Sequence, residues 1–171
     1  STMPQWAQEE LRSELQRLMT LLNVKTGVYN IETRLCKNGK PYIMEVSPRG
    51  GGNRLSEMMK HISGQDLIGN CVRAAVGDPI DEIQQPTYNG YWAEIILHSE
   101  CEGIFKSIEI DNRIEEKYLI EKDLWVREGE KVRGFTGANT TIGTLILRFM
   151  SEKTMKSLLN FQQGFYNIRI C

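Results

Sequence analysis

Two glutamates near the start of the chain lie on either side of an Asn38-Gly39 pair. Asn-Gly between two runs of β-forming residues is a strong signal for a hairpin, because a tight type I′ turn needs positive φ at both central positions. If these two residues form the whole turn, Glu32 lies directly opposite Glu45. Opposed residues are about 4.5–5.5 Å apart at Cβ, and like charges there are destabilising. A divalent cation such as Mg²⁺, which prefers oxygen ligands, is the simplest compensation.

The same counting predicts the rest of the register. Because side chains alternate between the two faces, it places Asn30 opposite Ser47 on the face that carries the glutamates. The other expected pairs are Lys37 with Lys40, Leu35 with Tyr42, and Thr33 with Met44. One interpretation of this face is a metal site. The other is an ordinary solvated strand face on which two glutamates coexist.

The residues that follow the second strand favour the metal site. Arg49 lies four positions after Glu45, and three glycines and Asn53 come next. An arginine presents a planar fork that suits a carboxylate or a phosphate. Glycine permits positive φ and a close approach of the backbone to a ligand. Carboxylates, a guanidinium and a glycine-rich loop within a few residues suit a phosphate that is held through a metal.

Asn-Ile-Glu, the hairpin, and then Ile-Met-Glu-Val-Ser-Pro-Arg-Gly-Gly-Gly-Asn resemble the closing strands of the ATP-grasp nucleotide-binding fold. That superfamily includes carbamoyl-phosphate synthetase, biotin carboxylase, glycinamide ribonucleotide synthetase and the L-amino-acid ligases. The resemblance implies that Glu32 and Glu45 hold Mg²⁺ or Mn²⁺ on the phosphates of ATP. Ser47 would complete the metal site, with Asn30 beside it. Ser47 stands where the family usually has Asn, which predicts a weaker site.

The resemblance also assigns roles to the loop after the second strand. Arg49 would be catalytic, contacting the γ-phosphate of ATP or the acyl-phosphate intermediate. The backbone N–H groups of Gly50, Gly51 and Gly52, together with Asn53, would bind the carboxylate or phosphate of the substrate.

Composition indicates an ordinary globular protein. The chain has 171 residues, 40% of them hydrophobic and 25% charged, which is enough to form a core. With 21 basic and 22 acidic side chains there is no electrostatic case for binding nucleic acid or an anionic membrane. The four cysteines are widely spaced, which argues against a zinc site and indicates reduced thiols, so we expect a cytoplasmic protein. Ser1-Thr2 ahead of Met3 is expected to be a tag remnant.

Periodicity predicts an α+β fold, with an antiparallel sheet and flanking helices. The first half should contain a helix over residues 4–22 with a buried stripe, a helix capped by Asn53 or Ser56, and a helix between Gly64 and Gly77. The leucine stripe consists of Leu11, Leu15, Leu18 and Leu22. The apolar face of the third helix consists of Leu67, Ile68, Cys71, Val72, Ala74 and Ala75.

The second half reads as strand-rich. Strands are expected over 91–97, 103–110, 118–126 and 165–170, with a helix that Ser151 begins and whose inward residues are Met155, Leu158 and Leu159. We therefore expect residues 1–86 to be the C-terminal half of an ATP-grasp domain and residues 87–171 to be a C-terminal β-rich subdomain. This subdomain resembles that of L-amino-acid ligases. A biotinyl or lipoyl carrier domain is disfavoured, because no lysine lies between Val132 and Ile142.

The expected function is that of a fragment of an ATP-dependent carboxylate–amine ligase that forms an acyl phosphate. The alternatives are an enzyme of the carbamoyl-phosphate synthetase or biotin carboxylase type, which activates bicarbonate, and a non-catalytic binding or assembly module. An ATP-grasp enzyme also needs a lid and an N-terminal α/β domain, and one helix before residue 27 is neither. We therefore expect these domains as partners, an inactive isolated chain, and apolar surfaces that favour a homodimer.

Overall fold

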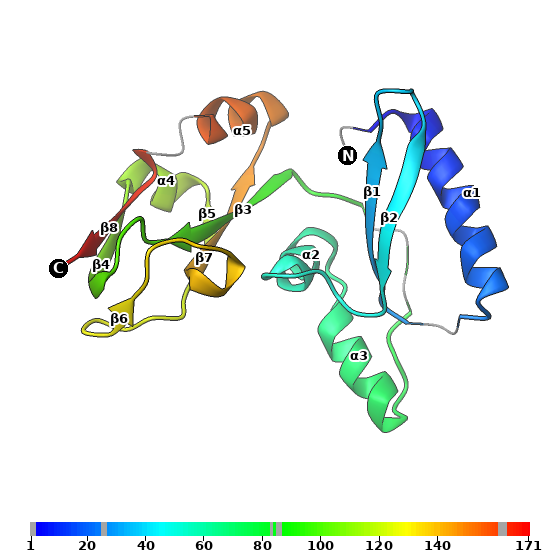
Figure 1. Ribbon diagram of the computed structural model, residues 1–171, viewed down its shortest axis with the longest axis horizontal. Coiled ribbons are helices and arrows are strands. Elements are labelled where there is room, and N and C mark those ends of the chain that lie inside the picture. Colours follow the sequence, from blue (N-terminus) through cyan, green and yellow to red (C-terminus); the bar gives the residue numbers. More distant parts are fainter. Residues whose placement is uncertain (1–2, 25–26, 83, 85–86, 161–163) are drawn as a thin grey trace. The chain divides into compact units, whose positions relative to one another are not determined.

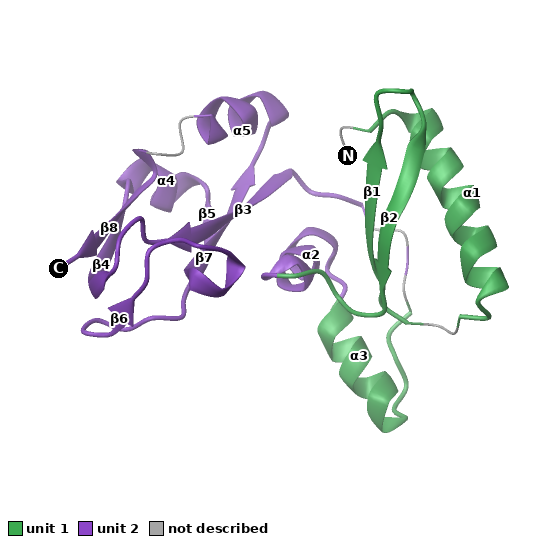
Figure 2. Ribbon diagram, in the orientation of Figure 1, with its two compact units in different colours: residues 1–52, 66–82 green, residues 53–65, 83–171 purple. Residues whose placement is uncertain are grey.

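The computed structural model describes residues 3–24, 27–82, 84, 87–160 and 164–171 (Figure 1). These residues form two compact units (Figure 2). The first unit contains residues 1–52 and 66–82, and the second contains residues 53–65 and 83–171. Among the described residues, none of the helices combines the length and the apolar character needed to cross a bilayer.

The first unit is built from helix α1 (Gln5–Leu21), the hairpin of β1 (Asn30–Leu35) and β2 (Pro41–Ser47), and helix α3 (Leu67–Val76). Helix α1 begins after Pro4, within one residue of the prediction. Its core contacts come from Ala7 and Leu11, which are buried. The predicted stripe is wrong at Leu22, which is 63% exposed, because the helix ends at Leu21 and Leu22 is its cap.

The hairpin confirms the predicted register at the end far from the turn and corrects it near the turn. Glu32 lies opposite Glu45, and Asn30 lies opposite Ser47. Nearer the turn the pairs are instead Thr33 with Ile43, Arg34 with Tyr42, and Leu35 with Pro41. The three expected pairs Lys37–Lys40, Leu35–Tyr42 and Thr33–Met44 are therefore wrong.

The reason is that the connection is one residue longer than a two-residue turn. Cys36 N donates to Lys40 O at 2.9 Å, and Gly39 N donates to Cys36 O at 3.0 Å. Three residues, 37–39, thus form the loop, and Gly39 occupies its left-handed position with φ of 75°. A β-bulge that leaves Met44 as the extra residue of β2 then shifts the register back.

Helix α3 buries a different face from the predicted one. Asp66 caps it by accepting a hydrogen bond from Gly69 N at 2.8 Å. Its one buried residue is Asn70, whose Oδ1 accepts hydrogen bonds from Asp81 N at 3.0 Å and from Arg73 at 2.7 Å. The expected apolar face is therefore wrong within this unit. Its members Ile68, Cys71, Val72, Ala74 and Ala75 are exposed.

The second unit contains two three-stranded antiparallel sheets, with strand orders β3-β7-β5 and β6-β4-β8. The strands are β3 (Tyr91–His98), β4 (Gly103–Ile110), β5 (Leu119–Leu124), β6 (Lys131–Val132), β7 (Thr141–Phe149) and β8 (Tyr166–Ile170). The helices are α2 (Leu55–Ser63), α4 (Asn112–Lys117) and α5 (Glu152–Leu159). The predicted strands and the helix after Ser151 are confirmed, whereas α4 was not expected.

The core of this unit is centred on β7. Residues 142–147 and 149 of that strand are all buried, because β3 and β5 flank it and other elements cover both of its faces. Leu97 and Phe105 pack into the same core. Ser151 caps α5 through Thr154 N, and the predicted inward residues pack against the core: Met155, Leu158 and Leu159.

Helix α2 belongs to the second unit although it follows the hairpin of the first in sequence. The predicted caps Asn53 and Ser56 are wrong, because Arg54 occupies the cap position and its backbone N–H donates to Glu94 Oε1 at 3.0 Å. The chain thus enters the second unit at residue 53, returns to the first at 66 and leaves it at 82. The sequence predicted a single change of domain near residue 86.

Candidate functional site

The two faces of the hairpin differ in character. On β1, Ile31 and Thr33 face α1, where they line a surface groove together with Leu11 and Leu15. Because side chains alternate along a strand, Asn30 and Glu32 project from the other face. Their register partners on β2 join them there, so that one polar face carries four oxygen-bearing side chains: Asn30, Glu32, Glu45 and Ser47.

The bulge is what brings the two carboxylates onto this face. The three-residue loop alone pairs Glu32 with Met44 and Glu45 with Ile31, because a shift of one residue sends every side chain to the opposite face. Glu45 would then point toward α1. The extra residue, Met44, restores Glu45 to the face of Glu32. Bulges that re-aim a side chain are frequent beside functional sites.

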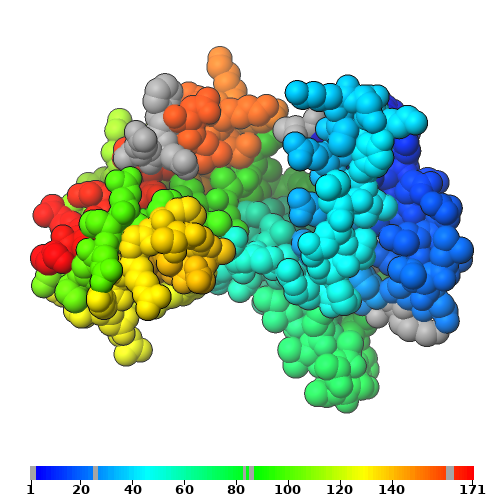
Figure 3. All heavy atoms as spheres, in the orientation of Figure 1, coloured from blue at the N-terminus to red at the C-terminus, as the bar shows by residue number. Residues whose placement is uncertain are grey.

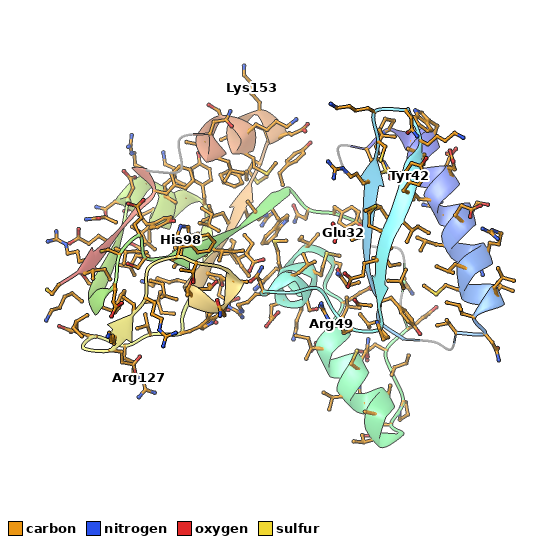
Figure 4. The ribbon with its side chains drawn as sticks, viewed as in Figure 1. Glu32, Tyr42, Arg49, His98, Arg127 and Lys153 are labelled. Atoms are coloured by element: carbon orange, nitrogen blue, oxygen red, sulfur yellow. The ribbon has the colours of Figure 1, made fainter. Side chains whose placement is uncertain are left out.

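The facing carboxylates are exposed and carry no counter-charge from the described part of the chain. Glu32 makes no hydrogen bond or ion pair with the described residues, and Figure 4 labels it on β1. Glu45 accepts a hydrogen bond from Ser47 Oγ. Two like charges in direct register destabilise a strand pair unless a cation compensates. This arrangement fits a hard divalent cation whose ligands are Glu32, Glu45 and Ser47.

The donor set fits a metal site at which the protein supplies only some of the ligands, and phosphate and water supply the others. The described residues contain no group of three or more histidine, cysteine or acidic side chains that could hold a metal ion. Mg²⁺ is commonly bound through one or two carboxylates plus substrate phosphates and water, so two carboxylates and a hydroxyl suit it. A calcium-type cage, which needs six or more oxygen ligands from the protein, does not match this donor set.

Arg49 lies just beyond β2 (Figure 4). Its hydrogen bonds within the described residues go to backbone carbonyl groups and not to the two carboxylates. Its backbone N–H donates to Ser47 O at 2.9 Å, and its Nη1 donates to Gly50 O at 2.8 Å. The guanidinium is exposed and makes no ion pair with the described residues. It is thus available to an anionic ligand, which is what its predicted role requires.

The loop after β2 has one residue with a left-handed backbone. Within the described residues of the loop, Asn53 adopts the left-handed region with φ of 53°, whereas Gly50, Gly51 and Gly52 do not. Their role in binding a substrate anion stays a prediction.

Sequence reasoning did not identify a partly buried ionic cluster in the second unit. Arg54, with 15% of its side chain exposed, pairs with Glu57 at 3.5 Å, with Asp123 at 3.4 Å and with Glu121. His61 Nε2 lies 2.8 Å from Glu121 Oε2. The hydrogen bonds from His61 and Arg54 lower the pKa of Glu121, although its partial burial acts in the opposite direction.

This cluster anchors α2 to β5, and thereby holds the end of the glycine loop that enters the second unit. Sequence offers no signal for it, because Glu121 lies 60 positions after His61 and 67 positions after Arg54. His61 also stacks on Trp92, with ring centroids 6.1 Å apart.

Comparison with solved structures shows proteins that resemble the whole of this chain. Phosphoribosylglycinamide synthetase from Anaerococcus prevotii has a TM-score of 0.80 and 21% identity, covering 100% of this chain and 44% of that protein. L-amino acid ligase from Bacillus licheniformis has a TM-score of 0.79 and 16% identity, covering 100% and 43%. The biotin carboxylase domain of Hydrogenobacter thermophilus 2-oxoglutarate carboxylase, solved with MgADP and bicarbonate, has a TM-score of 0.72 and 15% identity, covering 98% and 37%.

Among curated proteins, carnosine synthase 1 of Gallus gallus is 33% identical over 79 residues, which are 46% of this chain and 8% of that protein. No family model matches the sequence. The chain spans less than half the length of each of these proteins.

Proposed function

We propose that this chain, which has the fold of the C-terminal part of ATP-grasp domains, supplies the metal-binding carboxylates of an ATP-dependent carboxylate–amine ligase. In such a reaction the γ-phosphate of ATP passes to a carboxylate and gives an acyl phosphate and ADP. An amine then attacks the acyl carbon, an amide forms, and inorganic phosphate leaves. The likeness to two ligases, with TM-scores of 0.80 and 0.79, supports this reaction class.

The observation that carries the proposal is the direct register of Glu32 with Glu45 on an exposed face. Glu32, Glu45 and Ser47 would hold Mg²⁺ or Mn²⁺, and Asn30 lies beside them. When bound, the cation would neutralise phosphate oxygens and stabilise charge that develops during phosphoryl transfer. Holding a ligand against such preorganised groups lowers the barrier mainly through positioning and charge stabilisation.

Arg49 has a distinct role in this proposal. Its exposed guanidinium, just beyond Ser47, would bind the γ-phosphate or the acyl phosphate through its planar fork. The backbone N–H groups of Gly50, Gly51 and Gly52, with Asn53 after them, would bind the remaining substrate anion. Because ligands for ATP are needed from several sides, we propose that further domains of a longer protein complete the active site.

Activation of bicarbonate is the second candidate. The biotin carboxylase domain that was solved with MgADP and bicarbonate shares the fold, which supports ATP and Mg²⁺ for both candidates. Its TM-score of 0.72 is lower than the values for the two ligases. We therefore favour an organic carboxylate as the activated acid.

A titration of the 171-residue chain with Mn²⁺, followed by water-proton relaxation, tests the metal site. We expect saturable binding that Glu45→Gln and Glu32→Gln each weaken at least tenfold. The matched control is Glu10→Gln on α1, which removes the same charge from the same unit and should bind Mn²⁺ as the unchanged chain does. Equal binding by all four proteins would refute the proposal.

A second measurement addresses the isolated chain. We expect no ATP turnover, and isothermal titration with Mg-ATP should show no micromolar binding. Micromolar binding would refute the view that other domains complete the nucleotide site.

A further inference from the structure

The second unit contains a cavity that the proposed ligase chemistry does not use. Its volume is about 320 Å³, at the lower end of the range for small-molecule sites. One wall is the connection from β5 to β6, and the other is the loop that leads into β7. Buried Val132 and Ile142 form an apolar floor.

The cavity walls are held in place by hydrogen bonds from backbone and side-chain groups. Trp125 N donates to Ile142 O at 2.9 Å, which joins the two walls at one end. The indole N–H of Trp125 donates to Asp123 Oδ2 at 2.7 Å, so the ring has a fixed orientation beside the cavity. Thr136 N donates to Thr140 Oγ1 at 3.2 Å and closes the opposite loop on itself. The site is therefore formed before any ligand binds.

Two lining groups with positive charge differ in their availability. Lys131 Nζ is 2.6 Å from Glu102 Oε1 and is therefore already paired. The pKa of Glu102 is lowered mainly by the hydrogen bond from Lys131, and Arg133 contributes least. Arg133 makes no hydrogen bond or ion pair with the described residues. Its guanidinium interacts with Glu102 only electrostatically, so its N–H donors remain available to a carboxylate.

Two further lining groups have hydrogen-bonding capacity to spare. The Asn139 amide makes no hydrogen bond with the part of the chain that the structure describes. Glu130 is a carboxylate of which one oxygen, Oε2, accepts from Arg127 N at 2.8 Å, and its Oε1 makes no hydrogen bond to the described residues. An arginine and a glutamate that both line one cavity suit a ligand that carries both charges.

We propose that this cavity binds a free α-amino acid as its zwitterion. The carboxylate would bind the Arg133 guanidinium and the Asn139 amide, and the ammonium would bind Glu130. An apolar side chain would lie over Val132 and Ile142 against the Trp125 ring. The inference rests on residues of the second unit alone, and so it does not depend on the metal site of the first.

Isothermal titration of the 171-residue chain with L-phenylalanine tests this site. Two blocked analogues separate the charges: N-acetyl-L-phenylalanine keeps only the carboxylate, and L-phenylalaninamide keeps only the amine. We expect L-phenylalanine to bind and each analogue to bind at least tenfold more weakly. Equal binding of the acetylated form would show a simple anion site and overturn the proposal. So would no binding of L-phenylalanine up to about 10 mM, where even millimolar affinities are visible.

Variants localise the binding. Arg133→Gln should weaken L-phenylalanine at least tenfold, and Glu130→Gln should weaken it more than it weakens the acetylated form. The matched control is Arg127→Gln, because Arg127 lies on the same connection outside the cavity lining and its side chain points away from the unit (Figure 4). Loss of binding in the control, with unchanged circular dichroism, would overturn the assignment. Glu45→Gln should leave amino-acid binding unchanged, so failure of either proposal can be recognised separately.

Discussion

Ser47 Oγ donates a hydrogen bond to Oε1 of Glu45, two residues earlier on the same face of β2. Glu45 also faces Glu32 across the hairpin. Figure 3 draws the atoms of the hairpin in light blue and cyan. The serine hydroxyl therefore orients one carboxylate of the opposed pair.

This hydrogen bond predicts how the metal site responds to substitution. Ser47→Ala should weaken Mn²⁺ binding about fivefold, since a hydrogen bond contributes about 1 kcal/mol net. Ser47→Asn should bind Mn²⁺ more tightly than the unchanged chain, because the amide oxygen reaches further as a ligand. Relaxation titrations of the three proteins measure both effects. Weaker binding by the asparagine variant would show that Ser47 is not a ligand.

The opposed carboxylates predict that removing one of the two charges stabilises the metal-free chain. Glu32→Gln should raise the free energy of unfolding of the metal-free chain, because it removes a like-charge contact of about 0.2–1 kcal/mol. The same variant should lose the stabilisation that saturating Mn²⁺ confers. Urea unfolding with and without Mn²⁺ measures both, with Glu10→Gln as the charge control. A variant that is less stable without metal would contradict the repulsion.

The Glu121 cluster predicts a loss of stability in acid. Hydrogen bonds from His61 and Arg54 lower the pKa of Glu121 below its ordinary value of 4.5. Its contribution is therefore present above that value and is lost as the pH falls through the lowered folded-state pKa. Urea unfolding gives the free energy of unfolding at pH 6 and at pH 3. The decrease between pH 6 and pH 3 should be smaller for Glu121→Gln than for the unchanged chain. The control is Glu116→Gln at an exposed position, for which the difference should persist.

Gly143 predicts an intolerance to side chains in the core strand. A Cβ built there would lie 2.4 Å from Asp123 O and 3.1 Å from Leu124 Cα, both backbone atoms of β5. Gly143→Ala should therefore lower the free energy of unfolding by about 1–3 kcal/mol, as overpacking does. Thermal unfolding measures this. Gly164→Ala is the matched control and should change stability little, because no atom of the described residues other than its chain neighbours lies within 4 Å of the added Cβ.

Elements whose signals are local could be predicted from the amino-acid sequence alone. The Asn38-Gly39 pair predicts the hairpin, and alternation along β-forming residues predicts strands such as β4, whose bounds match the expectation. Ser151 predicts the start of α5, because a serine can satisfy a free N–H in the first helical turn. The pairing of Glu32 with Glu45 was also predicted, but from a two-residue turn and a regular strand. The loop is one residue longer and the bulge adds one residue to β2, and these two differences cancel in the register.

Features that depend on residues far apart in the sequence emerge only in the folded chain. The bulge at Met44 sets which face Glu45 occupies, and no local rule places it. Helix α3 buries Asn70 rather than its apolar residues, because the Asp81 backbone supplies a hydrogen-bond donor. Arg54 finds its partners in β5, nearly 70 positions away. Periodicity and turn chemistry act between neighbours in sequence, whereas burial and ion pairing act between neighbours in space, and only the folded chain determines which residues those are.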